Sequence, residues 1–198
     1  MQITETLYVT TRSAWRKWLK KNHAKKKEVW LIYYKKNSGK KRIPYVDAVK
    51  EALCFGWIDS TAKGIDDEKY AQRFGPRRKG SPISPLNLEH IRELLNEGKM
   101  TPAGMIHLTG KENSTHEEAH AVMKLKHEKL IIPKDVEKAL KKDPEVWKNF
   151  QAFPENYKRI RIGWFDVRTP ARTDVWKTRL DYFIKMTKKN KRFGTIKE

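Results

Sequence analysis

The residues best suited to chemistry gather in one stretch of the chain, Ala52–Ser84, which reads ALCFGWIDSTAKGIDDEKYAQRFGPRRKGSPIS. Basic residues from Arg73 to Lys79 lead there into Ser84 and Pro85, a pair typical of a helix start. Guanidinium groups and the free amides of a helix start both bind negatively charged groups. The stretch therefore predicts a site for a phosphate or a carboxylate, and it names a ligand class rather than a reaction.

The predicted site combines an aromatic ring, a carboxylate, four cations and three small polar side chains. The predicted ligand-binding residues are Trp57, Asp59, Lys63, Arg73, Arg77, Arg78, Ser81, Ser84 and Asn87. Asp59 could orient a cation, or act as a general base if burial raised its pKa. A structural interpretation stays open, in which Asp59 pairs with Lys63 or Arg73, Trp57 fills the core and Ser84 caps a helix. No cofactor and no catalytic residue is assigned.

A second pattern, His116-Glu117-Glu118-Ala119-His120, matches the H-E-x-x-H motif of zinc enzymes. Two histidines one helical turn apart can bind zinc, but such a site also needs a third ligand and an apolar surrounding. Here the motif lies in a polar stretch, and Met123 and Lys126 stand where the extended motif needs its glycine and third histidine. We therefore predict a solvated helix without a metal site.

A third pattern interleaves basic and aromatic residues near the C-terminus. Its members are Tyr157, Lys158, Arg159, Arg161, Trp164, Arg168, Arg172 and Arg179. Such a set can bind single-stranded nucleic acid by stacking and phosphate contacts. The alternative is an amphipathic helix with a buried tryptophan and solvated arginines. The sequence contains no glycine-rich phosphate loop, dinucleotide fingerprint or serine elbow. It therefore gives no support to nucleotide hydrolysis of the P-loop type or to α/β-hydrolase chemistry.

Hydrophobic periodicity and capping residues define the elements that position these side chains. A strand at Trp57–Ala62 and an antiparallel return at Tyr70–Phe74 flank a polar turn and hold the first site. Ser84 and Thr101 each precede a proline and start a helix. We also expect a helix ending near Asn22, a strand at Val29–Tyr34, a helix opened by Pro44 and ended by Gly56, and helices over 133–142, 144–151, 155–167 and 173–189.

These elements predict an α+β fold, in which N-terminal helices surround a small, largely antiparallel sheet and a C-terminal helical unit follows. We place the α+β domain at residues 1–110 and a polar linker or mobile helix at 111–131. The helical C-terminal unit, with a basic tail, occupies 132–198. A chain of 198 residues and 11% aromatic side chains is large enough to bury a sizeable core.

The formal net charge of +20 is concentrated at the two ends of the chain. Residues 12–42 hold 13 basic side chains against Glu28 alone, and residues 168–198 hold ten against three acidic ones. Such a surplus attracts polyanions, although lysine-rich faces commonly serve only solubility. Cys54 is the single cysteine, and the sequence shows neither a signal-peptide pattern nor a membrane span, so we expect a cytoplasmic protein.

The chain resembles the YdeI/OmpD-associated, or bacteriocin-protection, family. The likeness is carried by ALCFGWIDS, DDEKYAQRFGPRRKGS, NLEHIRELLNEGKMTPAGM, NFQAFPENYKRIRIGWFDV and TRLDYFIKMTKKNKRFG, and it covers nearly the whole chain. The resemblance implies a small, soluble bacterial protein, from a family named for association or protection phenotypes and without a settled enzymatic reaction. It therefore speaks to the fold more than to the function.

These observations together predict a protein that binds an anionic small molecule or a phosphate group in an arginine-rich pocket. One alternative is an enzyme that uses Asp59 as a base and the arginines as an electrostatic clamp. Another is a protein that associates with nucleic acid or the cell envelope surface through its lysine-rich ends. Whether a reaction is catalysed and which oligomer forms are left open.

Overall fold

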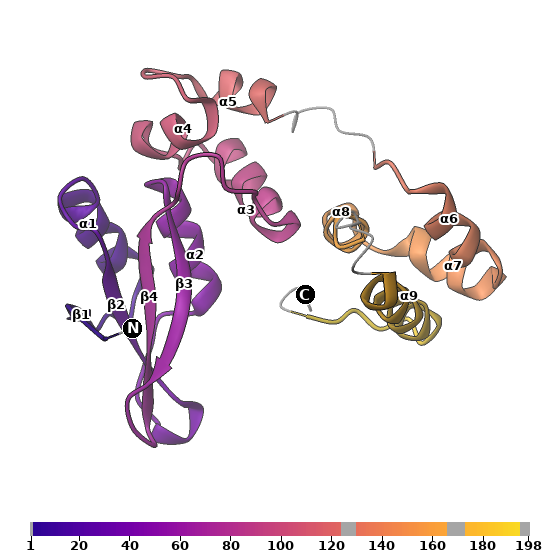
Figure 1. Cartoon of the computed structure of the whole chain (residues 1–198), viewed down its shortest axis with the longest axis horizontal. Helices are drawn as coiled ribbons and strands as arrows, with labels where there is room; N and C mark the ends of the chain where they lie inside the picture. The colour runs from indigo at the N-terminus through magenta and orange to yellow at the C-terminus, as the bar shows by residue number, and fades with distance from the viewer. Residues whose placement is uncertain (1, 124–129, 166–172, 195–198) are drawn as a thin grey trace. The chain divides into compact units, whose positions relative to one another are not determined.

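The computed structural model describes residues 2–123, 130–165 and 173–194, and the chain divides into two compact units (Figure 1). The first unit comprises Met1–Pro82 and His90–His127, and the second comprises Ile83–Glu89 and Glu128–Glu198. The predicted α+β fold class is confirmed, because a four-stranded sheet with helices is followed by helices. The boundary between the units runs within helix α3, Pro85–Asn96, whose first turn belongs to the second unit.

The sheet of the first unit has the strand order β1-β2-β4-β3. Its strands are β1 (Thr6–Leu7), β2 (Val29–Tyr34), β3 (Trp57–Gly64) and β4 (Lys69–Pro76). The three long strands, each of which was predicted, pair antiparallel. The two-residue β1 pairs parallel to β2 and was not predicted, because two residues show no alternation.

Strand register decides which side chains share a face of the sheet, since directly paired residues point to the same side and neighbours in sequence alternate. Asp59 pairs with Phe74, whereas Arg73, the residue before Phe74, pairs with Trp30. Asp59 and Arg73 therefore lie on opposite faces of the sheet.

Four further helices belong to the first unit, namely α1 (Arg12–Asn22), α2 (Tyr45–Cys54), α4 (Pro102–Thr109) and α5 (His116–Val122). Thr11 caps α1 through a hydrogen bond from the Ala14 amide. Gly56, as predicted, follows α2, where it adopts the left-handed conformation. Fully buried Trp15 of α1 meets the ring of Phe74 edge-on at 5.5 Å. This contact places α1 against the face of the sheet that carries Phe74 and Asp59.

The second unit contains α6 (Lys134–Lys141), α7 (Pro144–Ala152), α8 (Glu155–Gly163) and α9 (Thr173–Lys188). Asp143 caps α7 by accepting a hydrogen bond from the Glu145 amide at 3.0 Å. The helices enclose a core in which Leu140, Phe150 and Phe183 are at most 2% exposed. Each such side chain contributes roughly 1.5–3 kcal/mol through removal of apolar surface from water. None of the described helices combines the length and the hydrophobicity that a membrane span requires.

Candidate functional site

The strongest concentration of unneutralised charge in the predicted site is the turn that follows β4, which we call the cationic turn (Arg77–Ser81). The Ser81 amide donates to the Arg78 carbonyl at 3.2 Å, and Gly80 adopts a positive φ of 75° that favours glycine. The Arg77 guanidinium donates to the Ser81 carbonyl and so braces the turn from inside. In the described part of the chain, no carboxylate pairs with Arg77, Arg78 or Lys79.

Arg77 sits at the point where the turn meets the end of α2. Its amide donates to the Gly56 carbonyl at 2.9 Å, and its side chain is half-buried. Burial lowers the pKa of the Arg77 guanidinium. The Arg77 guanidinium has lost part of its hydration and has gained no acidic partner among the described residues, which costs free energy. A bound anion would offset that cost.

His107 of α4 completes this site, and sequence reasoning missed it. A side chain at Gly56 would overlap the His107 ring, so the imidazole lies directly on the Gly56 backbone. His107 is exposed over part of its surface, and the partial burial of its ring, followed by the charge of Arg77, lowers its pKa. We call Gly56, Arg77 and His107 the anion site. His107 is 30 residues distant from Arg77 in the sequence, and no motif there links the two.

The start of α4 is fixed to the end of α2, and this contact is what brings His107 to Gly56. Both the amide and the hydroxyl of Thr101 donate to the Cys54 carbonyl, at 3.1 and 2.5 Å. Gly104, one turn into α4, packs so closely on the same carbonyl that a larger side chain would overlap it. The predicted Thr101 cap is therefore also a tether between two helices.

Arg73 is neutralised away from the anion site. Its guanidinium contacts the Glu28 carboxylate at 2.7 and 2.6 Å and donates to the Ser60 hydroxyl at 3.2 Å. Hydrogen bonds from Thr4 first, and then from Arg73, lower the pKa of Glu28. The charge of Arg73 is therefore neutralised by Glu28, the residue that precedes β2. Arg77 has no such partner among the described residues.

Trp57 and Asp59 are engaged in the packing of the first unit. Trp57 is 1% exposed, and its indole donates to the His23 carbonyl at 3.2 Å. Asp59 accepts a hydrogen bond of 2.5 Å from the Tyr45 hydroxyl, whose pKa is raised by burial and by this bond. The open structural interpretation is thus right for Trp57 and wrong in pairing Asp59 with Arg73, because Arg73 points to the other face.

The remaining predicted residues are spread over both units. Lys63 is exposed towards the end of β3 in the first unit. Ser84 and Asn87 belong to the second unit, where the Ser84 hydroxyl accepts from the Asn87 amide at 3.3 Å at the start of α3. Of the predicted set, the structure brings together Arg77, Arg78 and Ser81.

The H-E-x-x-H motif lies in α5, and Glu118 within it helps to cap the start of that helix. The Thr115 hydroxyl accepts from the Glu118 amide at 3.1 Å, and the Glu118 carboxylate accepts from the Thr115 amide at 2.7 Å. Glu118, which occupies a variable position of the motif, is thereby committed to a capping box. Among the described residues, no group of three or more metal-binding side chains converges.

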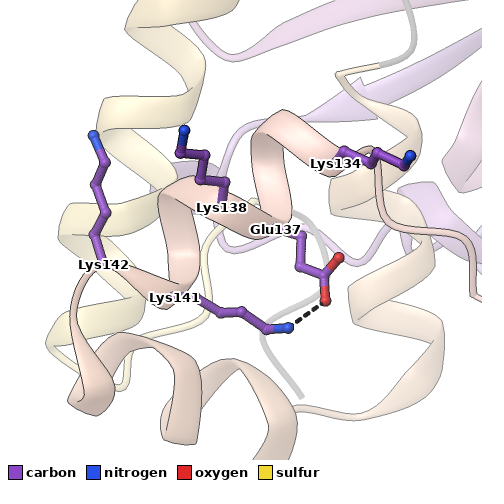
Figure 2. A pocket seen from close by; sticks show the side chains of 5 residues that line it. All are labelled: Lys134, Glu137, Lys138, Lys141 and Lys142. Atoms are coloured by element: carbon purple, nitrogen blue, oxygen red, sulfur yellow. Dashed lines mark ion pairs between the residues drawn. The ribbon is translucent and has the colours of Figure 1, made fainter.

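A shallow hollow on the second unit is lined by four lysines and one glutamate. The hollow has a volume of about 380 Å³ and is formed by Lys134, Glu137, Lys138, Lys141 and Lys142. Figure 2 shows Lys138 and Lys142 pointing the same way, while Lys141 pairs with Glu137 at 2.6 Å. Because one helix supplies the whole lining, the lysines attract anions through charge without enclosing them.

Comparison with known families separates the two halves of the chain. Residues 7–107 match the model of a domain of unknown function, DUF8412, and residues 129–190 match the model of the bacteriocin-protection, YdeI or OmpD-associated family. The runs of the Ala52–Ser84 stretch, which suggested the second family, thus lie in the first match. A search of curated proteins found no match, and neither did a search of solved structures.

Proposed function

Since this chain belongs to the DUF8412 family and carries a bacteriocin-protection, YdeI or OmpD-associated domain, we propose that it binds a small phosphate- or carboxylate-bearing ligand at Gly56, Arg77 and His107. The observation that carries the proposal is the half-buried Arg77, which has a histidine beside it and no carboxylate partner in the described part of the chain. An anion between the two would receive hydrogen bonds from both, and charged hydrogen bonds are the stronger kind.

The cationic turn adds long-range attraction to this contact. Arg78 and Lys79 are exposed beside Arg77, so an approaching anion meets three positive charges within three consecutive residues. Gly56 allows the His107 ring to lie on its backbone, and a larger side chain at this position would displace the imidazole. Asp59 stays outside the proposed site, because its carboxylate is bound to Tyr45.

The proposal is tested by thermal unfolding with inorganic phosphate or sulfate, against chloride at equal ionic strength. At about ten times its dissociation constant, a bound anion stabilises the fold by about 1.4 kcal/mol and raises the melting temperature by about 3 °C. The double variant Arg77→Ala, Arg78→Ala should lose this rise.

The matched control is Lys20→Ala, Lys21→Ala, which removes two exposed charges from α1 and should keep the rise. Phosphate and sulfate also stabilise proteins because they are excluded from the protein surface. This general stabilisation should be the same in the control variant and in the Arg77→Ala, Arg78→Ala variant. An equal rise in the two double variants would refute the site.

A further inference from the structure

A second arginine is buried without a carboxylate partner, in a different unit from the anion site. Arg161 of α8 is 8% exposed, and its Nε atom has no hydrogen-bond partner in the described residues. Its charge is met by the Phe193 carbonyl, which accepts a hydrogen bond from the guanidinium, and by aromatic rings. Burying a cation against neutral groups alone is costly, so this arrangement calls for an explanation.

Three aromatic rings surround the Arg161 guanidinium. Its central carbon lies 4.0 Å from the ring centre of Phe193, 5.1 Å from that of Tyr157 and 5.5 Å from that of Trp164. Arg179 of α9 lies over Trp164 as well, at 4.8 Å, and donates to the Trp164 carbonyl at 3.2 Å. We call these five residues the arginine cage. It offers stacking surfaces and two cations, and no carboxylate pairs with either cation in the described residues.

Phe193 differs from the other cage residues because it comes from the tail beyond α9. The chain turns at Asn190, whose φ is 49°, and returns so that the Phe193 amide donates to the Tyr157 hydroxyl at 3.3 Å. The Phe193 ring also meets Tyr182 edge-on at 4.9 Å. Gly194 follows with a φ of 83°, against the Arg161 guanidinium. The tail thus inserts one ring and one carbonyl oxygen into a site formed by the helices.

We propose that the arginine cage binds single-stranded nucleic acid, with one nucleotide in the place that Phe193 occupies. The Phe193 ring marks where a base would stack on the guanidinium, and its carbonyl oxygen marks where a phosphate oxygen would accept a hydrogen bond. A nucleotide supplies both groups and also the negative charge that the cage lacks. The formal net charge of +20 favours a polyanion over a neutral peptide as the occupant.

The test is fluorescence anisotropy of a labelled oligothymidylate with the full chain. Phe193→Ala removes the competing ring, and we expect the oligonucleotide to bind about fivefold more tightly than to the unaltered protein. Adding Trp164→Leu to that variant should weaken binding by about tenfold, through the loss of one stacking surface. Val175→Ala, an exposed position on the same helix as Arg179, is the control and should leave affinity unchanged.

A measurement on the unaltered protein keeps the proposal testable if Phe193→Ala unfolds the second unit. Saturating oligonucleotide should speed hydrogen exchange at the Phe193 amide, because displacement breaks its bond to Tyr157. Failure to bind oligothymidylate near 50 mM salt would overturn the proposal. So would binding that leaves the Phe193 amide protected, since contact would then occur elsewhere, for instance at the lysines of α6.

Discussion

At the scale of single residues, charge compensation separates the arginines of this protein into two groups. In one group, among the described residues, carboxylates accept hydrogen bonds from the guanidinium: Glu51 binds Arg12 and Arg16, Glu28 binds Arg73, and Glu89 binds Arg159. Arg77 donates to the Ser81 carbonyl and lies beside His107, and Arg161 donates to the Phe193 carbonyl and lies over the Phe193 ring. Among the described residues, neither arginine has a carboxylate partner. Removing one partner of a buried pair is strongly destabilising, whereas an arginine without a carboxylate partner gains from an added anion. An added anion should therefore stabilise the protein through the arginines of the second group and have little effect through those of the first.

The anion site should make stability depend on pH through His107. Its pKa is lowered in the folded protein, so the unfolded chain binds the proton more readily and stability is complete above the ordinary value of 6.5. Stability then falls as the pH drops below that value towards the lower folded pKa. Thermal melts from about pH 7.5 to about pH 5 should show this fall, and sulfate should reduce it by raising the His107 pKa.

The control for this prediction is His107→Gln, which should lessen both the fall and the pH dependence of the sulfate effect. If the variant keeps a sulfate effect that grows as the pH drops, just as in the unaltered protein, another group responds to the anion.

The sequence predicted the cationic turn but could not show which of its arginines would lack an acidic partner. Glu28 is 45 residues from Arg73, and Glu89 is 70 residues from Arg159. Pairing over such separations depends on tertiary contacts, which no local pattern encodes. His107 was missed for the same reason, since only the tether between Thr101 and Cys54 brings α4 to Gly56.

At the scale of elements, local capping chemistry decided where helices begin. Thr101 caps α4 as predicted, and Thr11 and Asp143 cap α1 and α7 in the same way, because each side-chain oxygen accepts an amide hydrogen bond within three residues. The stretch that was predicted to be a linker or mobile helix contains α5, which begins with a capping box at Thr115. The helical alternative given for this stretch therefore agrees with the structure over His116–Val122.

Loss of the α4 cap should affect stability and anion binding together. Thr101→Ala removes the cap and the hydroxyl bond to Cys54, so we expect unfolding to cost about 1–2 kcal/mol less. The sulfate-induced rise in melting temperature should shrink as well, because α4 positions His107. Urea unfolding and the thermal shift measure the two effects.

The matched variant is Thr115→Ala, which removes the equivalent cap from α5 and does not touch the tether. It should destabilise the protein and leave the sulfate response intact. A full sulfate response in Thr101→Ala would show that the tether does not position the site.

At the scale of the whole molecule, two units with separate interiors carry two distinct cationic sites. The buried tryptophans of the first unit lie in the sheet and in α1, which packs on it. The second unit has a core of its own around Phe150 and Phe183. Composition and element order predicted the α+β class, because strands confined to the first half and helices beyond it leave few alternatives. They could not predict that the start of α3 joins the second unit, since a helix reads as continuous in sequence.

Separate interiors should give separate patterns of local unfolding. Phe150→Leu removes packing from the core of the second unit and should destabilise it by about 1 kcal/mol. Hydrogen exchange should then quicken in α7 and α9 while β2 and β4 keep their protection. Phe74→Leu, the same change in the first unit, should produce the reverse pattern. Uniform loss of protection in either variant would show that the chain unfolds as one cooperative body.

The division of α3 between the two units limits where this protein can be cut into fragments. Glu89 forms a bidentate pair with Arg159 at 2.8 Å, and Pro85 packs against Gly163, so a piece of the first half completes the second. A gene fragment that encodes only residues from 130 onward would lack both contacts. We therefore expect the C-terminal helices to be less stable as a fragment that begins at residue 130 than as a fragment that also carries residues 83–89.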